Sequence, residues 1–375
     1  MSAVPLVGWI TVSYLEIVML YWMGNKELEV RFSSAPIEHA FVRYGKQSGR
    51  CTVLCDQIKG RDELYQAFID YMDQVLASDS EAQFMFYAST HALGVLAIRP
   101  DLRSHIVCQN SDTLISWLTN KSMTRFWASN YVSIPPSTMI SGGEIRLQFA
   151  ESAFPGCERF VIQENVSSAG RGTYLLDTKS ERHVASALSK DNVYLLSPYI
   201  VNGRSYSSNM LIDEEKTVVL PSVRQNILVI NGKLRFCGSD FSSCLAQHLR
   251  DEIARYSRRM GDALRLSGYR GYLGIDYLEI DGTLMFLEVN PRFQGSSFLI
   301  DRALSERALP ALATLHLQCF SSRIPKDITR EIEAMDIGVG YMNTELASKD
   351  IVLSGKKKVL FETSEPGQRF IFYRC

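Results

Sequence analysis

The segment from Gly271 to Ser297 constrains the fold of this chain more than any other part of the sequence. It contains two stretches of alternating pattern, Gly274–Glu279 and Thr283–Val289, and the dipeptide Asp281-Gly282 lies between them. Alternation of period two predicts half-buried strands, and Asp-Gly is typical of a two-residue hairpin turn. The segment therefore predicts an antiparallel hairpin.

Three side chains with oxygen ligands interrupt this apolar hairpin. Asp276 lies five residues before Asp281 and Glu288 lies six residues after Gly282, so neighbouring antiparallel strands bring the two carboxylates close together. Asn290 shares the alternation parity of Glu288 and projects to the same side while the strand stays regular. Buried carboxylates need a partner or a metal, and carboxylate and amide oxygens are ligands that suit Mg²⁺. The three residues therefore predict a magnesium site.

With these residues, the segment 268–297 resembles the metal-binding signature of the ATP-grasp superfamily, a Gly-x-Asp/Glu-aromatic strand followed by Glu-x-Asn-x-Arg. The resemblance implies an ATP-grasp fold of the α/β (α+β) class. It also implies that Asp276, Glu288 and Asn290 bind one or two Mg²⁺ ions, or Mn²⁺ in their place. Arg292 would contact the γ-phosphate or the acyl phosphate. The similarity runs from about residue 112 to 320.

Segments upstream of the hairpin follow the order of the same family. Asn120-Lys121 resembles the start of the nucleotide domain, where the lysine reaches the phosphates. The turn between the predicted strands Arg159–Asn165 and Tyr174–Leu176 resembles the lid loop, and Ser197–Ser207 resembles the hinge that stacks adenine. Arg292 and Lys121 are the candidate catalytic residues. The candidate ATP-binding residues are Lys121, Gln163, Ser168, Gly170, Arg171, Gly172, Tyr199, Ile200, Ser205 and Arg224.

Three positions depart from the family pattern. Gln163 stands where a lysine is common before the lid loop, and Ser197 and Ser205 stand where carboxylates are common in and after the hinge. The loss of one cation together with two carboxylates fits a compensated exchange, because such carboxylates often pair with the lysine. In this hypothesis Arg171 or Arg224 supplies the missing positive charge.

The remaining sequence predicts three units. Residues 1–111 alternate strand-like runs with amphipathic stretches such as Glu63–Leu76, which predicts a small N-terminal, mostly parallel α/β pre-grasp domain. Neither Gly-x-Gly-x-x-Gly nor the P-loop pattern occurs in it. Residues 112–196 correspond to the small lid subdomain and residues 197–375 to the large, metal-binding subdomain.

One apolar run, Ala3–Met23, is long enough to span a bilayer. No Lys or Arg precedes it, and Glu16 lies within it, where a carboxylate would be costly in lipid. A buried strand and a core helix are therefore expected, with membrane association as the alternative. The eight cysteines are irregularly spaced, so we expect reduced thiols in a cytoplasmic protein. The net charge of −1 gives no basic field for nucleic acid.

These features predict an ATP- and Mg²⁺-dependent ligase that forms an amide or peptide bond through an acyl phosphate. The expected partners are small-molecule carboxylates and amines of amino-acid-like type, because Asn-Pro-Arg-x-Gln-Gly-Ser-Ser resembles amino-acid ligases. Arg270 and Gln294 are candidates for the acceptor pocket. The family often forms dimers, so a homodimer is also expected. A small-molecule kinase and a nucleotide-binding protein that has lost catalysis remain as alternatives.

Overall fold

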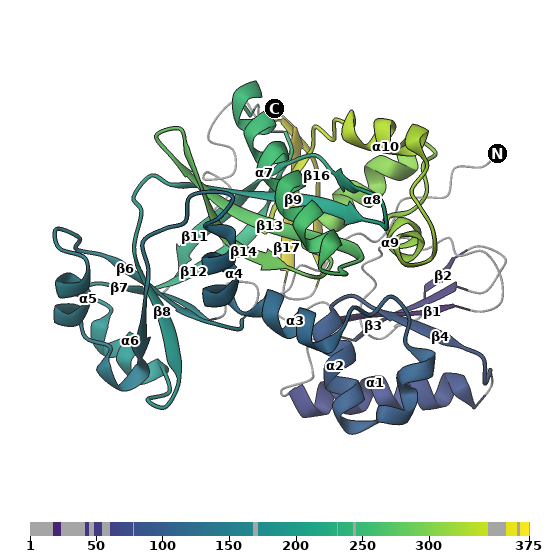
Figure 1. Cartoon of the computed structure of the whole chain (residues 1–375), viewed down its shortest axis with the longest axis horizontal. Coiled ribbons are helices and arrows are strands. Elements are labelled where there is room, and N and C mark those ends of the chain that lie inside the picture. Colours follow the sequence, from purple (N-terminus) through teal and green to yellow (C-terminus); the bar gives the residue numbers. More distant parts are fainter. Residues whose placement is uncertain are drawn as a thin grey trace.

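The computed structural model comprises an N-terminal unit, a lid and a large unit (Figure 1). In Figure 1 the lid projects to the left and the N-terminal unit lies at the lower right, below the green-to-yellow large unit. The structure describes residues 18–23, 42–44, 49–54, 61–77, 79–167, 172–230, 232–242, 245–343, 358–365 and 368–374.

The N-terminal unit contains a four-stranded sheet in which every neighbouring pair is antiparallel. Its strands, in the order β2-β3-β1-β4, are β2 (Val42–Tyr44), β3 (Gly49–Leu54), β1 (Val18–Met23) and β4 (Gln83–Phe86). The expected mostly parallel sheet is therefore wrong. Strands β3 and β4 run in the same direction and flank α1 in sequence. Because β1 lies between them in the sheet and runs in the opposite direction, both of its pairings are antiparallel.

Helices cover one side of this small sheet. The predicted amphipathic helix is confirmed as α1 (Arg61–Leu76), and it is joined by α2 (Ser89–Ile98) and the short 3₁₀ helix η2 (Pro100–His105). Phe68 of α1 and Phe84 of β4 lie in the resulting core. The apolar residues of α1 are thus spaced so that they face this core, as the sequence predicted.

Two short helices follow and pack on the large unit. They are α3 (Asp112–Thr119) and α4 (Lys121–Ala128), and Asn120 caps α4 by accepting a hydrogen bond from the Met123 N–H at 3.1 Å. Ile115 and Ala128 belong to the same hydrophobic core as the hairpin strands. These helices therefore precede the lid in sequence but share the core of the large unit.

The lid is an antiparallel sheet in the order β7-β6-β8-β5, with its own core beneath two helices. Its elements are β5 (Thr138–Ser141), η3 (Gly142–Glu144), α5 (Leu147–Ala153), β6 (Phe160–Glu164), β7 (Thr173–Leu176), α6 (Glu181–Ala187) and β8 (Val193–Pro198). The strands predicted on both sides of the lid loop are confirmed as β6 and β7.

The large unit has a sheet in the order β14-β13-β9-β11-β12, and the pair Lys233↔Tyr174 joins β12 to β7 of the lid. Its strands are β9 (Arg204–Ile212), β10 (Thr217–Val219), β11 (Val223–Ile230), β12 (Lys233–Asp240), β13 (Gly271–Ile280), β14 (Thr283–Asn290), β15 (Gly340–Asn343), β16 (Lys358–Glu365) and β17 (Gln368–Arg374).

Helices pack on both faces of this sheet. They are α7 (Gln247–Leu266), α8 (Ser297–Glu306), α9 (Leu312–Ser321) and α10 (Lys326–Glu333). Met210 of β9 lies in the core under α7, whereas the next residue, Leu211, lies in the core under α8 and α9. The alternation of β9 thus serves two cores, as expected for a strand between two helical layers.

No helix in the described residues is both long enough and apolar enough to cross a membrane. The last six residues of the apolar run Ala3–Met23 form strand β1 (Val18–Met23). The rest of that run lies outside the described residues.

His316 of α9 predicts a specific dependence of stability on pH. Its Nδ1 accepts a hydrogen bond from the Tyr272 N–H at 2.8 Å, and burial lowers the pKa of His316 to about 3. A histidine whose pKa is lowered on folding stabilises the protein above its unfolded pKa, roughly 6.5, and that contribution is lost as the pH falls below it.

We therefore expect the wild type to lose about 2 kcal/mol more stability than His316→Asn when the pH is lowered from 7 to 5. Asparagine does not become charged in this range, so it retains an acceptor without the cost of burying a cation. Urea unfolding of both proteins at several pH values measures the difference. Parallel pH profiles for the two proteins would contradict this account of His316.

Candidate active site

The two carboxylates of the hairpin face each other because the strand pairing contains a bulge. Tyr277 pairs with Phe286, but the preceding residue of β13, Asp276, pairs with Glu288. One extra residue, Leu287, therefore lies in β14 between these two pairs. In a regular hairpin Asp276 would face Leu287, and Glu288 would project to the opposite side of the sheet.

The burial of β14 shows the same change of face. Leu284 and Phe286 lie in the core under α7, and beyond the bulge Val289 continues that core. Glu288 and Asn290 line a cavity together with Asp276. The three predicted metal ligands thus line one cavity because of the bulge at Leu287 as well as the alternation of strand residues.

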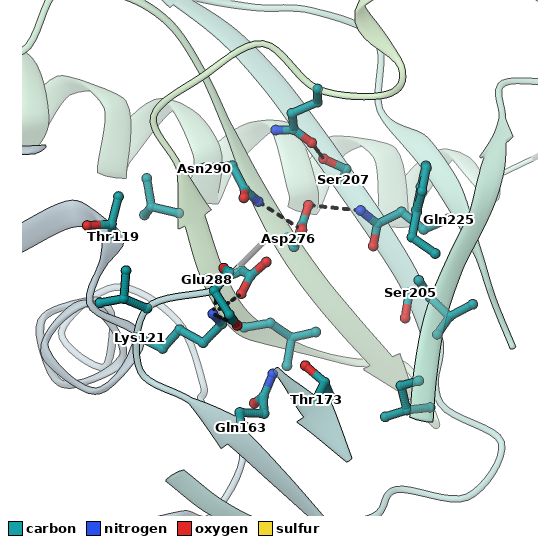
Figure 2. A pocket seen from close by; sticks show the side chains of 18 of the residues that line it. Thr119, Lys121, Gln163, Thr173, Ser205, Ser207, Gln225, Asp276, Glu288 and Asn290 are labelled. Carbon is teal, nitrogen blue, oxygen red and sulfur yellow. Dashed lines mark hydrogen bonds and ion pairs between the residues drawn. The ribbon is translucent and has the colours of Figure 1, made fainter. Parts of the chain in front are cut away.

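Asp276 lies at the centre of this group (Figure 2). The Nδ2 of Asn290 donates to its Oδ2 at 3.0 Å, and the Nε2 of Gln225 donates to its Oδ1 at 3.1 Å. Burial, with repulsion from the Glu288 carboxylate, raises the pKa of Asp276 to about 7. A divalent cation shared by the two carboxylates would remove this repulsion, so the side chains fit a bound Mg²⁺ ion.

Lys121 approaches Glu288 from the other side (Figure 2). Its Nζ lies 3.3 Å from Glu288 Oε2 and donates to the carbonyl and hydroxyl of Ser167, at 3.0 and 3.1 Å. Ser167 follows strand β6 of the lid. The lysine therefore connects the chain beyond β6 with Glu288, one of the predicted metal ligands.

One turn after Lys121 on α4, Arg125 contacts three strands. Its Nε donates to the Leu287 carbonyl at 3.0 Å, its Nη1 to Ser197 Oγ at 3.3 Å and its Nη2 to Gln163 Oε1 at 2.6 Å. Burial lowers the pKa of Arg125 to about 10, which leaves it charged at neutral pH. Two of its partners are positions that depart from the family pattern, and sequence analysis did not assign the missing charge to this arginine.

The cavity has a volume of about 640 Å³, within the range of small-molecule sites, and residues of all three units line it. The N-terminal unit contributes Tyr87 and His91. The Tyr87 carbonyl accepts a hydrogen bond from the Phe293 N–H at 3.1 Å, and Ala88 forms a bridge with Arg292. The N-terminal unit is thereby attached to the loop that follows the metal ligands.

Half of the candidate ATP-binding residues also line the cavity. They are Lys121, Gln163, Tyr199, Ile200 and Ser205, with Arg292 beside them. The Nη2 of Arg292 donates to Asn290 Oδ1 at 3.1 Å, which places its guanidinium next to the predicted metal ligands. Gln294, a candidate for the acceptor pocket, lines the cavity and accepts a hydrogen bond from Ser207.

Three other candidates, Ser168, Gly170 and Arg171, fall outside the described residues. Gly172 is buried next to Glu164 and does not line the cavity.

Two arginines correct the sequence interpretation. Arg224 is exposed on β11, whereas its neighbour Gln225 faces the cavity, because successive strand residues point to opposite sides. Arg270 donates to the backbone carbonyls of Arg265 and Tyr269 and does not line the cavity. Neither Arg224 nor Arg270 is therefore brought to the site, and Gln225 is a contact that sequence analysis missed.

The lid and the large unit thus enclose a cavity lined by paired carboxylates and by cations. Residues 120–296 match a family model described as an ATP-grasp domain. That range begins just before Lys121 and ends just after the Asn-Pro-Arg loop, so it includes all three predicted metal ligands. This part of the chain is therefore similar to ATP-grasp domains, and the expected ATP-grasp fold is confirmed.

A curated relative extends the comparison by sequence. The [butirosin acyl-carrier protein]–L-glutamate ligase of Niallia circulans is 26% identical over 180 residues, which cover 46% of this chain and 42% of the relative. The match thus spans about two fifths of the length of that relative.

Two solved structures show the same fold at low sequence identity. Carboxyaminoimidazole ribonucleotide synthase from Aspergillus clavatus, complexed with ATP, matches with a TM-score of 0.53 at 12% identity, covering 74% of this chain and 73% of that chain. The biotin carboxylase domain of Hydrogenobacter thermophilus 2-oxoglutarate carboxylase matches with a TM-score of 0.55 at 12% identity, covering 85% and 76%.

The hairpin turn generates a prediction about stability. Asp281 and Gly282 have φ angles of 50° and 80°, as expected for the type I′ turn of an Asp-Gly hairpin. Gly282→Ala is expected to destabilise the protein by about 1 kcal/mol, because a Cβ there has open space but a strained backbone. Gly143→Ala, at an exposed position without positive φ, is the control. Equal shifts of the two urea midpoints would contradict the prediction.

Proposed function

We propose that this chain is an ATP- and Mg²⁺-dependent, ADP-forming ligase that activates a carboxylate as an acyl phosphate and transfers it to an amine. One observation carries the proposal. The carboxylates of Asp276 and Glu288 meet the cations of Lys121, Arg125 and Arg292 on the walls of one cavity. Metal ions and phosphates are the ligands that complement such a mixture of charges.

Asp276, Glu288 and Asn290 would hold Mg²⁺, which supplies charge neutralisation for the nucleotide phosphates when it is bound. The adenine would lie at the hinge near Tyr199 and Ile200, at the other end of the cavity. The guanidinium of Arg159 lies 4.5 Å from the centre of the Tyr199 ring, and the Tyr199 N–H donates to the Arg159 carbonyl at 2.8 Å. These two contacts fix the hinge backbone in one orientation.

The proposed reaction joins two anions. A carboxylate oxygen of the substrate attacks the γ-phosphorus, the bond from that phosphorus to ADP breaks, and an acyl phosphate results. The amine nitrogen then attacks the acyl carbon, and inorganic phosphate leaves. Because both reactants of the first step are negative, a fixed positive field contributes most to lowering the barrier. Lys121 and Arg292 supply this field next to the metal ligands.

The substrate is proposed to be amino-acid-like. The Niallia circulans relative is named for L-glutamate as one of its substrates, and the Asn-Pro-Arg loop resembles that of amino-acid ligases. Arg292 and Gln294 from this loop line the cavity together with Tyr87 of the N-terminal unit. These residues offer a cation and polar groups for a substrate that has both a carboxylate and an amine.

Hydroxylamine provides a test that does not require the natural acceptor. The protein is incubated with ATP, Mg²⁺, hydroxylamine and pooled amino acids that include L-glutamate. A ligase yields ADP, phosphate and an amino-acid hydroxamate, which mass spectrometry identifies. A stable phosphorylated product would instead indicate a kinase, and ATP binding without release of ADP would indicate lost catalysis. Either of these results contradicts the proposal.

The assignment of the metal ligands predicts how Mg²⁺ affects nucleotide binding. Mg²⁺ is expected to tighten ADP binding to the wild type by on the order of tenfold, because it links the phosphates to the two carboxylates. Glu288→Gln should lose most of this gain. Calorimetric titrations with ADP in Mg²⁺ and in EDTA measure it, with Glu151→Gln on the exposed face of α5 as the control. An unchanged Mg²⁺ effect in Glu288→Gln would reject the assignment.

A further inference from the structure

We propose that Arg125 binds a phosphate of the nucleotide that is not transferred, as a fixed cation built into the floor of the cavity. The inference deepens the proposed function and rests on its nucleotide site. It assigns to Arg125 the role that sequence analysis gave to Arg171 or Arg224.

Arg125 is a buried cation that has no anionic hydrogen-bond partner among the described residues. Arg125 is 3% exposed, and its three acceptors are a backbone carbonyl, a hydroxyl and an amide oxygen. Within the described part of the chain Arg125 forms no ion pair, and the charge of Glu288 acts on it without a direct contact. A buried charge without an anionic partner is unfavourable. An anionic ligand in the cavity would relieve this.

The guanidinium of Arg125 also has more hydrogen-bond donors than its contacts use. A guanidinium carries five N–H groups, and the three contacts of Arg125 use one on Nε, one on Nη1 and one on Nη2. One N–H on each terminal nitrogen is left. Arg125 lines the cavity, and two N–H groups in one plane suit a phosphate with two oxygens. The guanidinium can therefore bind phosphate and keep its hydrogen bonds to Leu287, Ser197 and Gln163.

The position of Arg125 selects which phosphate it meets. It contacts Ser197 at the start of the hinge and Leu287 next to Glu288. A nucleotide with its base at the hinge and its γ-phosphate near Lys121 and Glu288 has its inner phosphates between these points. Arg125 would therefore contact the α- or β-phosphate. Its anchoring by three strands keeps the guanidinium in place before the nucleotide arrives, which lowers the entropic cost of binding.

The test compares ligands that differ only in their phosphates. Arg125→Gln removes the charge but retains a polar side chain among the same partners. Calorimetry with ADP, AMP and adenosine in Mg²⁺ then gives three affinities. We expect ADP to bind about tenfold to a hundredfold more weakly, the usual effect of a charge-assisted hydrogen bond, and adenosine to bind within about twofold of the wild type. Arg182→Gln, exposed on α6, is the matched control.

A second variant separates charge from architecture. Gln163 Oε1 lies 2.6 Å from Arg125 Nη2, so a lysine at position 163 brings an ammonium group to nearly the same place. The double variant Arg125→Gln/Gln163→Lys is therefore expected to recover most of the ADP affinity. A purely structural role for Arg125 predicts no recovery, and it predicts equal losses for ADP and adenosine.

The outcomes distinguish this inference from the proposed function. If the wild type binds ADP and Arg125→Gln binds it equally well, or loses adenosine to the same degree, the assignment of Arg125 is overturned and the ligase proposal stands. If the wild type binds ADP but forms no hydroxamate, the ligase proposal fails, and the same titrations still decide the role of Arg125. If the wild type binds no ADP, both are rejected.

Discussion

The extra residue in β14 determines what the β13–β14 hairpin can do. Leu287 turns Glu288 to the side of Asp276, so the two carboxylates share one face. The same residue offers its carbonyl to Arg125, because a bulged residue is left out of the ladder of strand hydrogen bonds. The bulge therefore brings the two carboxylates together and anchors a cation next to them. With the same residues in regular pairing, Glu288 and Asn290 would project toward the core under α7, and Val289 would project away from it.

The buried environment of the cavity disfavours the charged forms of the groups that line it. Burial raises the pKa of Asp276 to about 7 and lowers the pKa of Arg125 to about 10, so both charged forms are disfavoured by desolvation. Gln225 and Asn290 donate hydrogen bonds to Asp276, and Gln163 and Ser197 accept hydrogen bonds from Arg125. None of these neutral side chains cancels the charge of its partner. A metal–phosphate ligand would neutralise both, which explains why one site contains unpaired groups of both signs.

Local chemistry was predictable from the sequence, and long-range packing was not. The Asp-Gly turn and the flanking strands depend on neighbouring residues. The counts of five and six residues around the turn are unequal, so they pair the two carboxylates only because β14 contains one extra residue. The bulge was not predictable, because Leu287 reads as a regular apolar residue. The contacts of Arg125 were not predictable either, because its partners are 38, 72 and 162 residues away in the sequence. The N-terminal sheet was misjudged because β1 pairs between β3 and β4.

The N-terminal unit has a larger part in the site than its lack of motifs suggested. The segment that matches the ATP-grasp family begins at residue 120, yet the Asn-Pro-Arg loop is attached to Tyr87 and Ala88, which lie outside that segment. Arg292 belongs to the bridge with Ala88, and it also donates to the metal ligand Asn290. The orientation of this arginine therefore depends on two units at once. A change of the N-terminal unit would therefore reach Arg292 and the cavity through this loop, although that unit has no motif of its own.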